Sequence, residues 1–516
     1  MATHDSNKWL IAATTTLGTF MEVLDTSVAN VALPHMQGTY AAGTDEITWV
    51  LTSYLVANAI ILPMTGWLGS YFSRKRVYLA CLVVFTLASL GSGAAPNLGI
   101  LILMRVIQGL SGGAMVPMSQ AILLEAFPKE EHGKATAVFG IGVIFGPILG
   151  PLVGGWITDN WGWPWIFYIN IPVGLLAIAL SVIFIKDPKY LKKPAGRVDT
   201  WSFLFIAIGL GSLEVFLNRG QRYDWFESTF IKVFGTMALL GIALFIWRSF
   251  AARNPLVDLR ILKNREFASG LGLMFMASFG MYGAFVTLPL FMQNLLNFTP
   301  TWAGLVLSPG GVASLVGMIL VGFLIGKVDI RAMVGAGFLL MGFSCYLLTS
   351  LYLGVSFEYL VTAWIFHGFG LGLLFVPIGV NAVSRISPAK MGEATGLFNL
   401  MRNEGGSVGI AAATTLLARR VQFHQTALVG HVSAFDHAFQ QGSMALGEAA
   451  QAAGGEDSLS AGRAALGFIA REVQRQAAVL SFVDVFWFLM LAFAVSLPFI
   501  ALLRSGKTAG RPLMVH

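Results

Sequence analysis

The sequence predicts an all-α membrane protein that crosses the bilayer many times. Of its 516 residues, 56% are hydrophobic and only 11% are charged, whereas a soluble chain usually carries about 25% charged residues. The apolar residues are gathered into long runs, and about 20 such residues are needed to cross a hydrocarbon layer of about 30 Å. This composition excludes a soluble enzyme, a disordered chain and a secreted disulfide scaffold.

Fourteen apolar runs are long enough to be membrane spans. We expect helices, because open strands leave backbone groups unsatisfied in lipid and because the runs lack the alternation of barrel strands. The predicted spans are residues 10–34, 47–68, 77–95, 99–126, 134–157, 164–185, 201–217, 229–249, 267–292, 301–326, 332–353, 357–384, 391–418 and 480–503.

The basic residues indicate how the spans are oriented. Most Lys and Arg residues follow alternate spans, as at residues 74–76, 186–197 and 248–265. Basic loops stay in the cytoplasm, so we expect both termini there, as an even number of spans requires. The net charge of +7 is therefore explained by topology, and no nucleic-acid partner is expected.

An internal repeat divides the chain. Residues 133–139 and 392–398 share the pattern GxATxxF at matching positions of two spans. A same-direction repeat of six-helix halves is the arrangement of major facilitator transporters. We therefore expect a first half at residues 1–185, two additional spans with their linkers at 186–266, and a second half at 267–516.

Residues 66–76, GWLGSYFSRKR, resemble the loop between helices 2 and 3 of this superfamily. The motif positions are Gly66, Arg74, Lys75 and Arg76. The chain departs from the family pattern, because Ser70 replaces the usual acidic residue and Ser73 the second usual glycine. The basic triplet could therefore serve only as a topology anchor.

Residues 105–113, RVIQGLSGG, resemble the helix 4 motif of the family. An arginine among membrane residues is costly, so Arg105 should face the bundle interior or a wet cavity. The resemblance implies a part in proton coupling through a nearby carboxylate. The alternative is a structural hydrogen-bond anchor.

Residues 146–155, GPILGPLVGG, resemble the helix 5 motif associated with antiporters. Glycines four residues apart form a flat stripe that another helix can approach closely, and prolines favour a bend. The stripe could act as a hinge for rocking, or only as a close-packing surface. The motif residues are Gly146, Pro147, Gly150, Pro151, Gly154 and Gly155.

Residues 20–34 and 163–174 resemble the first and sixth helices of the 14-helix drug:proton antiporters, although Pro164 replaces a usual basic residue. The resemblance covers nearly all of residues 10–503 and is strongest to the EmrB-type multidrug exporters. It implies proton-coupled efflux of hydrophobic and amphipathic toxic compounds across a bacterial inner membrane by alternating access, and hence antibiotic resistance. It also implies a periplasmic adaptor (membrane fusion) protein and, through it, an outer-membrane channel as partners.

Two other transporter functions stay open: a proton-coupled uptake symporter and a single-substrate exporter of the same fold. An enzyme is not expected. Residues 109–113 spell GxSxG, but they lie within a span rather than in a strand–turn–helix. Residues 505–508 end like a phosphate-binding loop, but Ala501 replaces the required glycine. No cofactor and no metal site are predicted.

Acidic residues within spans are the candidate proton carriers. Glu22 and Asp25 are three residues apart and share a helix face, and a carboxyl group that alternates between neutral and charged forms can carry a proton. Asp25 matches the family motif, whereas Glu22 does not clearly match it. Glu404 is a further candidate. Because Arg402 lies two residues away, about 200° around the helix, the two cannot both face one cavity.

Polar residues within spans are the candidates for a substrate cavity, which the many Phe and Met residues would make apolar and adaptable. His367 is as compatible with a packed, hydrogen-bonded position as with substrate binding. The predicted cavity residues are Asn30, Gln108, His367 and Arg402.

Residues 419–479 form a polar outer loop, whose last part, 460–479, reads as a helix leading into the final span. A loop of this length is usually functional or disordered. The EmrB-type resemblance implies adaptor docking or an exit gate at this loop.

Overall fold

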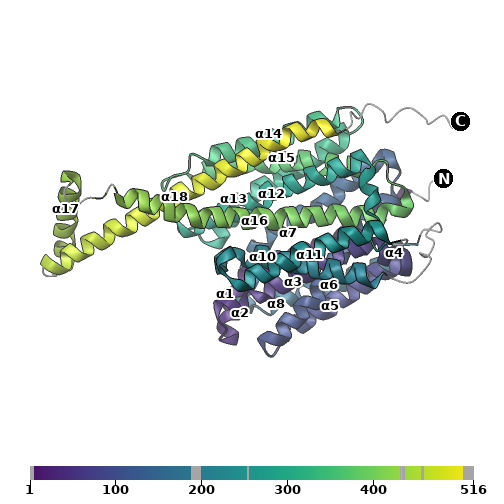
Figure 1. Ribbon diagram of the computed structural model, residues 1–516, viewed down its shortest axis with the longest axis horizontal. Helices are drawn as coiled ribbons and strands as arrows, with labels where there is room; N and C mark the ends of the chain where they lie inside the picture. Colours follow the sequence, from purple (N-terminus) through teal and green to yellow (C-terminus); the bar gives the residue numbers. More distant parts are fainter. Residues whose placement is uncertain are drawn as a thin grey trace.

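The computed structural model describes residues 5–187, 199–252, 255–430, 432, 436–454 and 458–503. Long helices running along a common direction form a bundle (Figure 1). Apart from one bridge between Ile325 and Val328, the described residues form helices and the turns that join them. The expected all-α fold is confirmed.

The first group of helices extends from α1 to α9. α1 packs against α6, α7 and α9, while α5 packs against α6 and α9, and α3 against α6. The bounds are α1 Asp5–Tyr40, α2 Thr44–Ile47, α3 Trp49–Ile61, η1 Leu62–Met64, α4 Thr65–Phe72, α5 Arg74–Gly93, α6 Leu98–Ala126, η2 Lys129–Glu131, α7 His132–Trp161, α8 Trp165–Tyr168 and α9 Asn170–Phe184.

The second group extends from α12 to α18. α15 packs against α13 and α14, and α16 packs against α12 and α18. The bounds are α12 Arg265–Asn294, α13 Pro300–Leu324, α14 Ile330–Leu348, α15 Phe357–Val383, η6 Pro388–Lys390, α16 Met391–Gly430, α17 His437–Gly454, α18 Ser458–Phe499 and η7 Ile500–Leu502.

A helical hairpin lies between the two groups in sequence. It consists of α10 (Thr200–Gly220) and α11 (Thr229–Ala251), joined by η3 (Gln221–Tyr223) and η4 (Trp225–Glu227), and η5 (Leu259–Lys263) follows it. A methyl group added at Gly241 would lie 2.6 Å from the backbone of Gly209, so glycine permits the two helices to approach closely. α10 also contacts α3 and α16, one helix from each group.

Among the described residues, eleven helices are long and apolar enough to cross a membrane, three fewer than the fourteen predicted spans. The long helices outside this set are α1, α7 and α16, with 36, 30 and 40 residues. α1 and α16 carry charged residues in their central turns, namely Glu22, Asp25, Arg402 and Glu404, which are buried inside the bundle. Interior polar residues thus lower the mean hydropathy of helices that the bundle surrounds. The number of fourteen spans stays a prediction.

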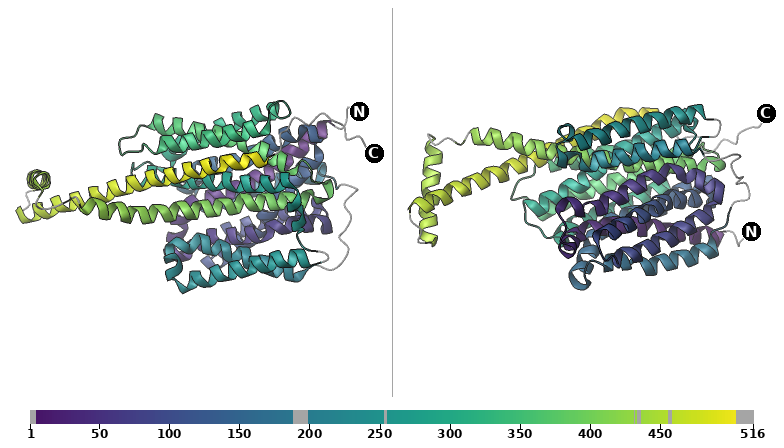
Figure 2. Two further views of the ribbon diagram at one scale, coloured as in Figure 1. Left: turned by 45° about the horizontal axis from the view of Figure 1, so that its top comes forward. Right: turned by 60° about the horizontal axis from the view of Figure 1, so that its bottom comes forward.

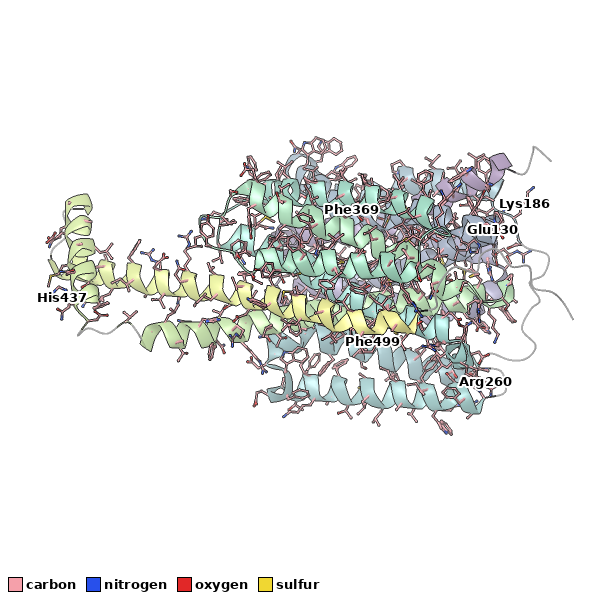
Figure 3. The ribbon with its side chains drawn as sticks, turned by 90° about the horizontal axis from the view of Figure 1, so that it is seen from above. Glu130, Lys186, Arg260, Phe369, His437 and Phe499 are labelled. Carbon is pink, nitrogen blue, oxygen red and sulfur yellow. The ribbon has the colours of Figure 1, made fainter. Side chains whose placement is uncertain are left out.

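The two ends of the bundle differ. Glu130, Lys186 and Arg260 lie at one end, which we call the basic end, and His437 lies at the opposite end (Figure 3). At that opposite end α16 and α18 extend past the other helices, and α17 lies at their tips (Figure 2). We call residues 419–430, 437–454 and 458–479 the arm. The predicted helix before the last span is confirmed, because α18 begins at Ser458.

Candidate proton-coupling site

The carboxylate of Asp25 lies at the centre of a buried polar cluster. It accepts hydrogen bonds from Nη1 of Arg105 at 2.5 Å, Nε2 of Gln108 at 3.0 Å and Nδ2 of Asn170 at 2.7 Å. Asp25 is 2% exposed and Arg105 is fully buried. Because the donors come from α6 and α9, one carboxylate on α1 joins three helices.

Aromatic rings and a backbone carbonyl hold the guanidinium of Arg105. Its Cζ lies 4.3 Å from the ring centroid of Tyr54, and its Nε donates to the carbonyl oxygen of Val50 at 3.2 Å. A buried cation needs such contacts in addition to its counter-ion to offset lost hydration. The surroundings of Arg105 therefore match the interior position that its sequence context predicts.

Glu22 extends the polar cluster toward the second group of helices. Its Oε1 accepts hydrogen bonds from the hydroxyl of Tyr54 at 2.8 Å and from Nδ2 of Asn58 at 3.1 Å. Asn58 in turn accepts a bond of 3.1 Å from Nδ2 of Asn403 on α16. We call the connected set the central polar network. Its members are Glu22, Asp25, Tyr54, Asn58, Arg105, Gln108, Asn170 and Asn403.

Arg402 and Glu404 face different neighbours, as their spacing on the helix requires. Arg402 is 5% exposed and interacts electrostatically with Glu22. Glu404 is 4% exposed, and the charged group that acts on it is Glu214 of α10. The structure therefore brings Arg402 to the central polar network and directs Glu404 to the hairpin.

The other predicted cavity residues are not brought together. Gln108 is fully buried and bonded to Asp25, whereas Asn30 is exposed and donates to the carbonyl of Thr26. His367 stacks on Trp364 with ring centroids 4.5 Å apart. Neither ring nitrogen of His367 has a hydrogen-bond partner among the described residues. His367 is thus packed among aromatic rings.

An apolar cavity of about 190 Å³ lies beside the Asp25 cluster. Asn170, which donates to Asp25, is the amide side chain in its otherwise apolar wall. A cavity with these walls suits an apolar group and places it next to a donor of the central carboxylate. The lining residues are Phe20, Met21, Leu24, Leu149, Val153, Ile169, Asn170 and Val173.

The glycine stripe of α7 lies against α1. A methyl group added at Gly146, Gly150 or Gly154 would collide with Val23, Ser27 or Val28 of α1, whereas one added at Gly155 would have its nearest neighbour 3.9 Å away. The predicted close-packing surface is confirmed for the first three glycines. The side chains of Pro147 and Pro151 lie outside the described ones, and the hinge stays a prediction.

The loop motif contacts the second group of helices at the basic end. A methyl group at Gly66 would lie 2.6 Å from Cα of Glu393. Arg74 pairs with Glu125 and donates to the carbonyl oxygen of Pro388 at 3.1 Å. Lys75 instead donates to the carbonyl of Val182, and Arg76 is exposed. Gly66 and Arg74 therefore hold the two groups of helices together at this end.

Several members of the central polar network were not predicted as site residues. Tyr54, Asn58, Asn170 and Asn403 were missed, although a lone amide within an apolar span is itself a signal of an interior polar contact. Asn170 also lies within the sequence that resembles the sixth antiporter helix. The partners of these amides depend on the rotation of their helices, which apolar sequence does not reveal.

Comparison with known proteins agrees with this fold. The family model of the Major Facilitator Superfamily matches residues 15–410. The chain belongs to the major facilitator superfamily. Superfamily membership indicates a transporter rather than an enzyme, and the apolar helices make it a polytopic membrane protein.

Several curated relatives of this facilitator are named as export or resistance proteins. It is 32% identical to the multidrug export protein EmrB of Escherichia coli over 476 residues, covering 91% of this chain and 90% of that protein. It is also 32% identical to the fatty acid resistance protein FarB of Neisseria gonorrhoeae over 496 residues, covering 96% of each. The predicted EmrB-type resemblance is confirmed.

A solved facilitator supports the fold alone. The human organic anion transporter MFSD10 (TETRAN) aligns with a TM-score of 0.59 at 14% identity, covering 94% of this chain and 99% of that one. The predicted major facilitator architecture is therefore confirmed.

Proposed function

We propose that this facilitator is a proton-coupled antiporter that exports hydrophobic and amphipathic toxic compounds from the cytoplasm of a bacterium across its inner membrane. The observation that carries the proposal is the buried ion pair between Asp25 and Arg105 within the central polar network. A buried ion pair in a membrane helix bundle is costly, so a pair that is present there marks a candidate functional site. The similarity to EmrB and FarB supports export of toxic compounds.

The proposed mechanism is alternating access. Protonation of Asp25 neutralises the counter-ion of Arg105 and frees the donors on α6 and α9 to move. Glu22 transmits the resulting movement to α16 through two hydrogen bonds, from Asn58 to Glu22 and from Asn403 to Asn58. The contacts at Gly66 and Arg74 hold the cytoplasmic end closed in this conformation. We assign the basic end to the cytoplasm, because basic loops stay there.

The apolar cavity beside Asn170 supports the choice of substrate class. An apolar group seated there would press on a donor of Asp25, so substrate binding and proton binding would share one carboxylate. This arrangement requires no cofactor and no metal. The proton supplies the driving force, at about 2.3 kcal/mol per 100 mV for each charge moved.

The arm supports a partner outside the membrane. Met444 on α17 and Leu466 and Phe468 on α18 are 66%, 52% and 51% exposed. Large apolar side chains exposed on an element that projects from the bundle are available to a protein partner. We propose that the arm binds a periplasmic adaptor of the membrane-fusion type, which continues to an outer-membrane channel.

The deciding experiment uses the purified full-length protein in proteoliposomes with ethidium as an amphipathic probe. An imposed pH gradient should drive ethidium against the direction of proton flow in the parent, and Asp25→Asn should abolish the coupled movement. Movement of ethidium in the same direction as protons would instead show a symporter. Coupled transport retained by Asp25→Asn would remove Asp25 from the mechanism.

A further inference from the structure

A second pair of buried carboxyl groups lies where the hairpin meets α16. Glu214 on α10 is 2% exposed and Glu404 on α16 is 4% exposed. Ser407, one helical turn beyond Glu404 on the same face of α16, donates to Oε1 of Glu214 at 2.9 Å. This bond places the end of Glu214 against the face of α16 that carries Glu404.

The two carboxyl groups are not equivalent. Both oxygens of Glu214 are occupied, since Oε1 accepts from Ser407 and Oε2 accepts from Nδ2 of Asn218 at 2.7 Å. Both oxygens of Glu404 are buried, and neither has a hydrogen-bond partner among the described residues. A buried carboxyl group without a partner is costly, so Glu404 needs an occupant that the protein itself does not supply.

The charged side chains on the surrounding helices are directed elsewhere. Arg402 interacts electrostatically with Glu22, and the guanidinium of Arg219 lies over the ring of Trp49. Arg248 pairs with Asp199, Asp484 pairs with Arg420 and His424, and Lys232 is exposed. The group that acts electrostatically on Glu404 is Glu214, which has the same sign of charge. Two buried carboxylates without a cation repel each other, and one proton held between them removes the repulsion.

From this geometry we infer that Glu214 and Glu404 form a second proton-binding site, which holds one exchangeable proton between the hairpin and α16. Loading the site takes up one proton from the aqueous phase, forms one carboxyl O–H bond and changes the charge of the pair from −2 to −1. Release reverses both changes. The inference rests on the proposed antiport, and it gives α10 a direct part in transport, because Glu214 comes from neither six-helix half.

The site also lies where α10 contacts α16. With the proton present, the carboxyl groups can bond across the junction, and without it they push α10 and α16 apart. The occupancy of this site would therefore bias the position of α16, which carries Asn403 of the central polar network. The protonation of Asp25 and that of the Glu214–Glu404 pair would then both influence the position of α16, through Asn403 and through Glu404.

The test is a pH-difference infrared spectrum of the purified full-length protein in lipid, which detects protonated carboxyl groups directly. Glu214→Gln and Glu404→Gln should each remove the same carboxyl band, and the double variant should remove no more than either single variant. Ser407→Ala keeps both carboxyl groups, so it should retain the band and shift the pH at which it changes. Glu227→Gln, at an exposed position in the same hairpin, should leave this band unchanged.

Band losses that add in the double variant would show two independent carboxyl groups and overturn the shared site. A Glu214→Gln spectrum identical to that of the parent would also overturn it. Correct folding is checked by a single symmetric elution peak and an unchanged melting temperature. A second measurement counts the protons released when ethidium binds in weakly buffered detergent. The count should fall by about one in Glu214→Gln and stay at the parent value in Glu227→Gln.

The two proposals can fail separately. If the parent moves no ethidium under a pH gradient while the shared carboxyl band is present, the antiport is wrong and the site stands. If the parent couples transport to protons and Glu214→Gln has an unchanged proton count, the second site is wrong and the antiport stands.

Discussion

Arg105 donates a hydrogen bond of 2.5 Å to Asp25 across 80 positions of sequence, and both side chains are shielded from solvent. The pair joins α1 to α6 inside the first group of helices. Gln108 and Asn170 add two further bonds to the same carboxylate. The proposed proton coupling depends on that cluster.

Removing one partner of this pair should destabilise the protein more than removing both charges. Arg105→Met leaves Asp25 buried without its counter-ion, and such a loss typically costs about 3–5 kcal/mol. Asp25→Asn combined with Arg105→Met should recover part of that loss. The measurement is a double-mutant cycle from unfolding in mixed micelles. Single-variant effects that add in the double variant would mean that the pair contributes no coupling energy.

Two glycines of α7 should respond differently to substitution by alanine. Gly150→Ala forces a methyl group against Ser27, and such overpacking should destabilise the protein by about 1–3 kcal/mol. Gly155→Ala adds the same methyl group where the nearest atom is 3.9 Å away, and it should change stability by less than about 0.5 kcal/mol. Melting temperatures and transport rates of both variants test this. Equal effects would show that α7 is not held against α1 by these contacts.

Ser73 has a strained backbone that glycine would relieve. Its φ is 81°, in a region that residues with a side chain rarely occupy, and its hydroxyl caps α5 by accepting from the backbone nitrogen of Arg76. Ser73→Gly should relieve about 1–3 kcal/mol of strain while losing a few tenths of a kcal/mol of capping. The melting temperature should therefore rise.

Ser70→Gly is the matched control for Ser73. Ser70 lies within α4, and a glycine inside a helix should cost about 0.5–1 kcal/mol. The two serines should thus respond to the same substitution with opposite signs. A lower melting temperature for Ser73→Gly would contradict the assigned strain.

A pH-dependent ion pair lies at the basic end. Burial alone would raise the pKa of Asp258, but the hydrogen bond of 2.7 Å from Lys390 and the neighbouring charges hold this pKa below its ordinary value. A lowered pKa contributes stability above the ordinary aspartate range, and the contribution is lost as the pH falls through the pKa of the folded state. Lys390 is exposed and Asp258 is half-buried, so solvent screens the pair and its contribution should be under about 1 kcal/mol.

Lys390→Met should therefore be less stable than the parent near neutral pH, and the difference should shrink in strong acid, where Asp258 is protonated. Lys390→Arg keeps the positive charge and should follow the parent across the whole range. Unfolding curves at a series of pH values provide the measurement. A difference that stays constant with pH would exclude the Asp258 pair as its source.

Substitutions of exposed apolar residues on the arm should lower the resistance of whole cells without lowering transport by the purified protein. Met444→Ser and Leu466→Ser alter exposed side chains far from the central polar network, so proteoliposome transport should equal that of the parent. Resistance of whole cells should fall, because export beyond the outer membrane needs the partner. Gln441→Ser, an exposed polar position on α17, should change neither. Full resistance in both apolar variants would place the partner surface elsewhere.

The sequence was sufficient to predict the fold and the buried positions of Asp25 and Arg105. Composition, span length and the repeat predicted the helical architecture, and the cost of charge in lipid placed Asp25 and Arg105 inside the bundle. The glycine spacing also predicted a close helix contact correctly. These inferences depend on local composition and on spacing along one helix, which a single sequence shows directly.

Contacts between distant helices could not be predicted in the same way. Nothing in the sequence indicated that Asn58 would bond to Asn403, or that Glu404 would face Glu214 rather than Asp25. Helices that are apolar on every side have no hydrophobic face that fixes their rotation. The partner of each polar side chain is therefore set by packing against several neighbours at once.

The 40 residues of α16 form one continuous helix from the basic end of the bundle into the arm (Figure 1). At about 1.5 Å per residue, the stretch from Glu404 to Gly430 measures about 39 Å. For a rigid helix, a tilt of about 10° at Glu404 displaces the outer end of α16 sideways by about 7 Å. Motion at Glu404 is thus amplified along α16 to the arm. A protein bound to the outer end of α16 would therefore sense or restrain each transport cycle.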